Sequence, residues 1–179
     1  MNAPTIRPST PADLESIRQV HLHAFPESEN ERVARLALEL CAETGTRPTV
    51  SLLAEQEGKV VGHVVFSPVT LTGAEEVSCY TLAPLGVMPD MQKRGIGTGL
   101  VKAGLKQLEN DGVQLVFVYG DPAYYGRFGF SQELARTYVP PYPLSLPFGW
   151  QALAFSDPGS MAHPIHMRLA DALSHPDLW

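Results

Sequence analysis

The stretch Val87–Leu100 (VMPDMQKRGIGTGL) decides the fold, because a strand end, a glycine-rich turn and a helix start follow one another within it. The apolar run Leu82–Met88 stops at Pro89, and helical periodicity begins directly after the turn. Gly95 and Gly97 let successive backbone N–H groups curl around one concavity, because no Cβ blocks positive φ or close approach. The helix adds its unpaired first-turn N–H groups and the positive end of its dipole. The stretch therefore predicts an anion site suited to a pyrophosphate.

Two common phosphate-binding turns fit this stretch poorly. A Walker loop requires a lysine directly after a glycine, and this turn has none. A Rossmann turn requires its third glycine at the position of Leu100, and its first glycine close to the strand end, whereas Pro89–Arg94 intervene. Asp121 lies roughly where a ribose-binding acid would fall, so a nucleotide-binding redox domain stays open as an alternative.

The pattern that fits without exception is Gln/Arg-x-x-Gly-x-Gly/Ala, here Gln92–Gly97. It resembles the acetyl-CoA pyrophosphate loop of the GCN5-related N-acetyltransferase (GNAT) family. A second stretch, Gly120–Phe130, ends in Tyr-x-x-x-Gly-Phe with Tyr125 at the tyrosine, which is similar to another signature of that family. Together with Leu82–Val87 (LAPLGV), these residues look like the YhbS-type subgroup of predicted acetyltransferases. The resemblance covers about residues 5–135.

The resemblance implies acetyl-CoA as cosubstrate, a direct attack of an amine on the thioester, and no metal. Backbone groups of Leu85 and Val87 would pair with the pantetheine arm, and an N–H placed there would stabilise the developing oxyanion. Tyr125 would act as general acid for the departing thiolate, since a phenol with a pKa of about 10 can donate to sulfur. The residues that would hold the pyrophosphate are Gln92, Lys93, Arg94, Gly95, Ile96, Gly97 and Thr98.

The amine must lose a proton before it attacks, and the sequence offers several carboxylates as the general base. They are Glu27 and Glu29 beside the first two expected helices, and Glu75 and Glu76 in a turn. We prefer Glu27 as a catalytic residue, because the family's acceptor site is lined by the first helix–helix segment. The histidines at 21, 23 and 63 are interpreted as structural, and those at 163, 166 and 175 lack the ligand spacing of a metal site.

Composition restricts the class of protein further. The chain has 179 residues, 44% of them hydrophobic, which favours one domain with a core. Its net charge of −6 disfavours nucleic-acid binding. Cys41 and Cys79 lie in apolar settings and are interpreted as small hydrophobes in a reducing compartment. The first residues do not resemble a signal peptide, and no apolar run approaches about 18 residues. We therefore expect a cytoplasmic protein with no membrane partner.

The periodicity of the chain predicts an α/β (α+β) fold. It has a central mixed, mostly antiparallel sheet, flanking helices and a βαβ acetyl-CoA-binding unit with a right-handed crossover. Residues 1–138 are expected to form the acetyltransferase core, and residues 139–179 a proline-rich elaboration packed on the same domain. Pro68 is expected to cause a bulge or bend. The expected strands are 5–8, 51–55, 60–71, 78–88, 113–119 and 151–155, the expected helices are 11–24, 30–45, 97–110 and 123–128, and 163–173 is left as strand or helix.

The sequence thus predicts an acetyltransferase that uses acetyl-CoA and an amine acceptor, either a small molecule or a peptide. A second hypothesis is an acyl-CoA-binding sensor or regulatory module without turnover, which a degenerate acceptor site would favour. The acceptor itself is left open, because acceptor loops vary while the cofactor loop is shared. The sequence also leaves open whether the proline-rich segment closes the site or builds a homodimer.

Overall fold

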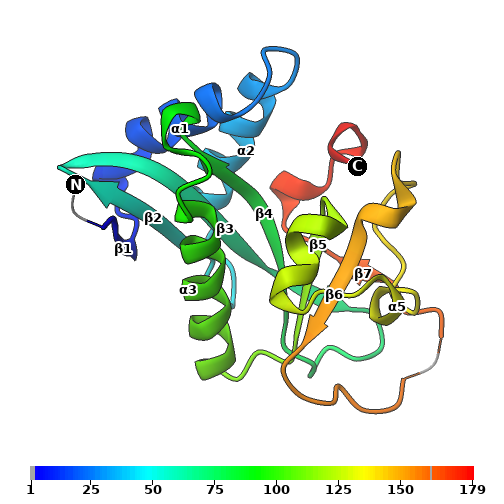
Figure 1. Cartoon of the computed structure of the whole chain (residues 1–179). Coiled ribbons are helices and arrows are strands. Elements are labelled where there is room, and N and C mark those ends of the chain that lie inside the picture. Colours follow the sequence, from blue (N-terminus) through cyan, green and yellow to red (C-terminus); the bar gives the residue numbers. More distant parts are fainter. Residues whose placement is uncertain (1–2, 162) are drawn as a thin grey trace. The chain divides into compact units, whose positions relative to one another are not determined.

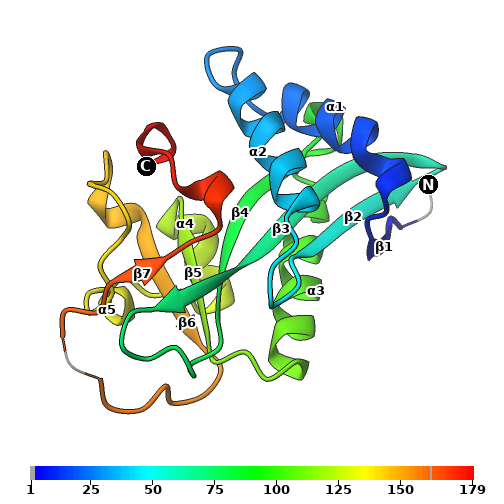
Figure 2. The same cartoon turned by 180° about the vertical axis from the view of Figure 1, so that it is seen from behind.

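The computed structural model describes residues 3–161 and 163–179, and in this part of the chain seven strands form a mixed sheet (Figures 1 and 2). The strand order is β1-β2-β3-β4-β5-β6, and β7 pairs with β3. The β4–β5 pair is parallel, whereas β1–β2, β2–β3, β3–β7 and β5–β6 are antiparallel. The predicted fold class, mixed and mostly antiparallel with flanking helices, is confirmed.

The elements fall close to the predicted ranges. The strands are β1 Thr5–Pro8, β2 Val50–Gln56, β3 Lys59–Leu71, β4 Cys79–Val87, β5 Leu115–Tyr119, β6 Trp150–Ala154 and β7 Met167–Arg168. The helices are α1 Leu14–Ala24, α2 Asn30–Ala42, α3 Ile96–Asn110, α4 Pro122–Tyr125 and α5 Gln132–Ala135. Helix α5 was not predicted. A register shift lies between Ala54 and Glu55 of β2, and the bulge or bend expected at Pro68 stays a prediction.

The chain forms two compact units, and β3 and β4 pass from one to the other. The first unit comprises Met1–Phe66 and Ala83–Gln107, and the second comprises Ser67–Leu82 and Leu108–Trp179. This division runs through the strands, so the predicted boundary at residue 138 stays a prediction. Each unit is described by itself below.

In the first unit, α1 and α2 cover one face of the sheet and α3 covers the other (Figures 1 and 2). Two successive residues of β3, which point to opposite faces of the sheet, show this directly. A Cβ on Gly62 would lie 3.0 Å from side-chain atoms of Ile96 and Leu100 in α3, whereas His63 contacts His21 of α1 on the opposite face. Both helix layers are amphipathic, and their buried stripes follow the helical period, as in Ile17 and Val20 of α1.

Two glycines on neighbouring strands remove side chains from both faces of this sheet at one place. Gly62 on β3 faces the first turns of α3, and Gly86 on β4 faces α1. A Cβ on Gly86 would lie 2.8 Å from Nδ1 of His21, and one on Gly62 would lie 3.4 Å from the Gly86 carbonyl oxygen. The sheet is therefore thin here, and the start of α3 and the end of α1 approach its backbone from opposite sides.

The second unit is built on β5, which is buried from Leu115 to Val118. Its parallel ladder with β4 runs from the Cys79–Leu115 pair to the Leu82–Val118 pair, and β6 pairs on its other edge. The Phe117 ring stacks on Trp150 at 5.5 Å and meets Tyr138 edge-on at 5.0 Å. These contacts bring Trp150 of the proline-rich segment into the core of this unit.

The contact between α3 and β3 leads to a stability prediction at Gly104. A Cβ at this position would overlap the ring of Phe66, which is completely buried, so Gly104→Ala overpacks the core. We expect the free energy of unfolding to fall by about 1–3 kcal/mol despite the better helix propensity of alanine. Gly99→Ala on the same helix is the matched control, because its Cβ would meet the Ile6 side-chain end at 3.3 Å. Urea unfolding of both variants measures this, and equal stabilities would contradict the packing.

Candidate active site

The predicted anion loop leaves β4 through a single 3-10 turn, Pro89–Met91. The amide of Met88 donates to the Val61 carbonyl oxygen at 2.9 Å, which fixes the loop's first residue to β3. Beyond the turn, Lys93 and Gly95 adopt left-handed backbone conformations with φ of 60° and 80°. Such alternation directs successive N–H groups toward one side, which makes a concavity for an anion.

The loop leads directly into the N-terminus of α3. Gly99 N–H donates to the Gly95 carbonyl oxygen at 2.8 Å, so regular helical bonding begins there. The predicted binding residues Gln92, Lys93, Arg94 and Gly95 are exposed, Gly97 and Thr98 are half-buried, and Ile96 is buried. The Ile96 side chain belongs to the core, so this residue can offer only its backbone to a ligand.

The strand that precedes the loop presents its backbone at the predicted arm-binding residues. Leu85 and Val87 are half-buried, and the Gln92 side-chain amide donates to the Val87 carbonyl oxygen at 3.1 Å. The parallel ladder of β4 with β5 ends at Leu82, while β4 continues to Val87. In the first unit, Leu85 and Val87 at the end of β4 are thus joined to the anion loop by one short turn.

The second predicted motif lies in the second unit. The Asp121 side chain accepts the Ala123 N–H at 2.9 Å and caps α4, a local role that explains this acid without a ribose. Tyr125 packs its ring where a Cβ on Gly120 would be, and meets Tyr124 and Phe130 edge-on at 5.0 Å and 5.9 Å. Burial, with Tyr124 nearby, raises the pKa of Tyr125, so the phenol keeps its proton at neutral pH.

A buried polar chain in the first unit was missed by sequence reasoning. His21 Nε2 lies 2.8 Å from His63 Nδ1, and His63 Nε2 lies 2.8 Å from Ser51 Oγ. Both histidines are completely buried, and burial lowers the pKa of each ring, so both are neutral at pH 7. Ser51 Oγ in turn lies 2.6 Å from Ser9 Oγ and 3.4 Å from Cys41 Sγ. Cys41 is therefore half-buried and polar in its contacts, in contrast to the apolar setting predicted for it.

The other candidate residues occupy surface positions. Glu27 is exposed in the turn between α1 and α2, and Glu76 is exposed as well. The Glu75 carboxylate accepts the Gly73 N–H at 3.0 Å, which lowers its pKa and gives it a local turn-forming role. Among residues 3–161 and 163–179, three or more metal-ligating side chains do not gather at any point. Within the same ranges every helix is too short or too polar to cross a membrane.

With this geometry in place, residues 5–132 match the family model described as the Acetyltransferase (GNAT) domain. The chain belongs to the GNAT acetyltransferase family. The matched range includes both motifs on which the sequence resemblance was based, and the family prediction is confirmed.

Relatives with sequence similarity lead to the same subgroup of GNAT proteins. The chain is 38% identical over 135 residues to the uncharacterized N-acetyltransferase YjhQ of Escherichia coli, covering 74% of this chain and 73% of that protein. It is 36% identical over 130 residues to the uncharacterized N-acetyltransferase YhbS of the same organism, covering 73% and 74%. The predicted resemblance to the YhbS-type subgroup is therefore confirmed.

Solved GNAT structures match the fold over most of the chain. YhbS from Escherichia coli in complex with CoA has a TM-score of 0.82 at 26% identity and covers 98% of this chain and 94% of its own. A GNAT family acetyltransferase from Brucella melitensis in complex with acetyl-CoA has a TM-score of 0.72 at 34% identity and covers 92% and 96%.

The buried histidine pair makes stability depend on pH. The folded state holds both rings below the usual histidine pKa of about 6.5, so the unfolded chain binds more protons as the pH falls below that value. We expect each ring to cost about 1–2 kcal/mol of unfolding free energy between pH 7 and pH 5. His63→Gln should flatten this dependence, and His23→Gln, at an exposed position of α1, should leave it unchanged. Urea titrations at both pH values measure it, and parallel slopes for all three proteins would refute the assignment.

Proposed function

We propose that the protein transfers the acetyl group of acetyl-CoA to an amine by direct attack of the amine on the thioester. The observation that carries this proposal is the left-handed turn at Lys93 and Gly95 leading into the N-terminus of α3. Such a turn and helix end bind a pyrophosphate through backbone N–H groups. The two solved relatives with CoA or acetyl-CoA bound support the same cosubstrate for this chain.

The proposed binding of acetyl-CoA uses backbone more than side chains. Residues Gln92–Thr98 surround the pyrophosphate, with Lys93 and Arg94 adding positive charge at exposed positions. Leu85 and Val87 pair their backbone groups with the pantetheine arm. An N–H of this strand that points at the thioester carbonyl stabilises the oxyanion, a contribution that typically amounts to about 3–4 kcal/mol for a donor of this kind.

Tyr125 is the proposed acid for the departing CoA thiolate. Its place in the Tyr-x-x-x-Gly-Phe signature supports this role, and burial, which raises its pKa, keeps the phenol protonated at neutral pH while making it a weaker acid. Gly129, four residues after Tyr125, has a φ of 96°, which only glycine adopts easily. This conformation turns the chain after the tyrosine. The Tyr-x-x-x-Gly-Phe spacing thus reflects a required backbone conformation.

The proposed acceptor is a small-molecule or peptide amine. Glu27 is the proposed base at the surface, where it can attract the ammonium form of such an acceptor. The first experiment is a calorimetric titration with acetyl-CoA and CoA, followed by an amine panel scored for free thiol. Saturable binding with thiol release from one amine class supports the enzyme. Binding without release from any amine favours a sensor module, and no binding contradicts the proposal.

The loop conformation predicts that Gly95→Val abolishes cofactor binding while the fold survives. Valine is strained at a φ of 80°, so the loop must change its conformation, although the space around Gly95 is open. We expect at least about a 100-fold loss of CoA affinity in calorimetry, because several backbone donors are displaced together. Gly58→Val imposes the same strain at a φ of 75° in the β2–β3 turn and should bind CoA normally. Undiminished affinity in folded Gly95→Val would remove the basis of the proposal.

The proposed acid predicts that Tyr125→Phe lowers turnover more than cofactor affinity. Loss of general acid catalysis is expected to reduce kcat by about 10²-fold or more, because the thiolate then leaves without a proton. Tyr124→Phe is the control, since this neighbour packs edge-on against Tyr125. Steady-state kinetics on both variants give the answer. Unchanged kcat in Tyr125→Phe would reduce Tyr125 to a packing residue.

A further inference from the structure

The polar chain of His21, His63 and Ser51 has a direction. Each imidazole uses Nε2 toward the next group, since His21 Nε2 contacts His63 Nδ1 and His63 Nε2 contacts Ser51 Oγ. A neutral imidazole carries one N–H and one lone pair. If His21 holds its proton on Nε2, His63 must hold its own on Nε2 as well, and the free lone pair of the chain lies on His21 Nδ1. If all bonds reverse, His21 Nδ1 carries the proton instead.

One end of this chain lies at β4. His21 Nδ1 is buried and has no hydrogen-bond partner among the described residues. A Cβ on Gly86 would lie 2.8 Å from it, so the nitrogen faces the β4 backbone between Leu85 and Val87. These are the residues proposed above to hold the pantetheine arm. A buried nitrogen without a partner is costly, and its position here matches a group that acts on a ligand of that strand.

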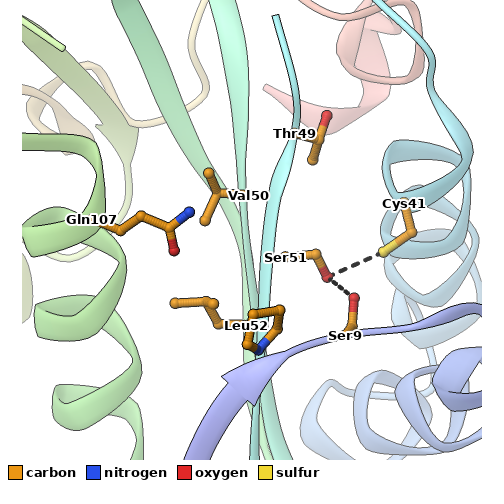
Figure 3. A pocket seen from close by; sticks show the side chains of 8 residues that line it. Ser9, Cys41, Thr49, Val50, Ser51, Leu52 and Gln107 are labelled. Carbon is orange, nitrogen blue, oxygen red and sulfur yellow. Dashed lines mark hydrogen bonds between the residues drawn. The ribbon is translucent and has the colours of Figure 1, made fainter. Parts of the chain in front are cut away.

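The other end of the chain opens into a pocket of about 210 Å³ at the edge of the sheet (Figure 3). Figure 3 shows the Ser51 hydroxyl between Ser9 and Cys41, with a hydrogen bond to each. All three residues are half-buried and line the pocket. A continuous path of short contacts therefore joins the interior face of β4 to a pocket large enough for several water molecules.

We propose that His21, His63 and Ser51 form a proton relay that takes up the acceptor amine's proton at β4 during acetyl transfer and passes one proton to the pocket at Ser9 and Cys41. The proposal rests on the acetyl transfer proposed above and assigns the amine's proton to this buried chain in place of Glu27, whose carboxylate then serves to attract the ammonium form of the acceptor. His21 Nδ1 is completely buried, so the amine does not reach it directly and a bound water passes the proton to it. His63 and Ser51 act through His21 and are positioning residues.

The proton transfers balance at every bond. The amine N–H bond breaks as a bridging water takes its proton and gives its own to His21 Nδ1. His21 Nε2–H then breaks and His63 Nδ1–H forms, and His63 Nε2–H breaks as Ser51 takes the proton and gives its own to pocket water. Both rings end neutral with their tautomers exchanged. Between turnovers, water at the vacated site takes the Nδ1 proton, and a proton from pocket water restores the starting tautomers. Over the full cycle the pocket gives back the proton that it received, the amine's proton leaves through water at the vacated site, and the relay holds it during the acetyl-transfer step.

The decisive variant is His63→Gln, because its side-chain amide can keep the bond to Ser51 but cannot pass a proton on. With acetyl-CoA and the best alkylamine of the panel, we expect kcat to fall about 100-fold at pH 7 with acetyl-CoA affinity unchanged. His23→Gln on α1 is the matched control at an exposed position and should behave as wild type. Ser51→Ala should lose activity in the same way, and Ser51→Thr, which keeps the hydroxyl, should restore it.

The pH profile separates a relay from a structural role. An alkylamine with a pKa of about 10 needs help in losing its proton at pH 7 but far less at pH 10. The titratable groups that face the two rings are Cys41 on α2, Asp13 before α1 and each ring itself, and of these His63→Gln removes the His63 ring alone. The kcat deficit should therefore shrink to less than about 10-fold at pH 10.

Each outcome decides something different. A wild type that binds acetyl-CoA but acetylates no amine overturns the proposed function and the relay with it. An active wild type with unchanged kcat in His63→Gln, or with a deficit equal at pH 7 and pH 10, overturns the relay alone. Loss of activity in Glu27→Gln together with full activity in His63→Gln would assign the proton to the surface carboxylate. A pH-dependent deficit that Ser51→Thr escapes supports the relay.

Discussion

The absence of side chains at Gly62 and Gly86 is the constraint on which the first unit depends. These neighbouring positions leave the sheet thin, so Ile96 and Leu100 of α3 rest on one side of it and His21 of α1 on the other. Because Ile96 is the first residue of α3, this contact fixes where the helix begins and hence where its free N–H groups lie. Larger residues at either glycine would move a helix relative to the strand that feeds the loop.

Cofactor binding and acid–base catalysis depend on different features of this structure. A cofactor held by backbone groups of a loop, a strand and a helix end depends on conformation, so few side chains reveal it beyond the required glycines. Acid and base functions depend on particular side chains and their burial. Burial keeps Tyr125 protonated and both histidines neutral at pH 7, so the former starts as a proton donor and the latter as proton acceptors.

The sequence predicted the parts of the structure that local rules control. The loop from Gln92 to Gly97 and the order of strands and helices follow from glycine placement and apolar periodicity, whereas Tyr125 was identified by the resemblance of its motif to a GNAT signature. The contact between His21 and His63 could not be predicted in this way, because it joins residues 42 positions apart whose meeting depends on strand register and helix rotation. The register shift between Ala54 and Glu55 was not predicted either, because it lies within the strand pairing of β2 beside the Arg7–Glu55 ion pair and β2 has no proline or glycine to mark it.

Energetics argue that the buried histidines serve more than packing. Two imidazoles in a dry interior lose hydration that one hydrogen bond between them only partly replaces, and one nitrogen has no partner at all among the described residues. Apolar side chains of similar volume would fill the same space between α1 and β3 without this cost. A polar chain that begins at the β4 backbone and ends at a pocket therefore stabilises the fold less than apolar packing would, and it provides hydrogen-bonded groups for proton transfer. This lower stability is the physical reason for assigning the His21–His63–Ser51 chain a role in proton transfer.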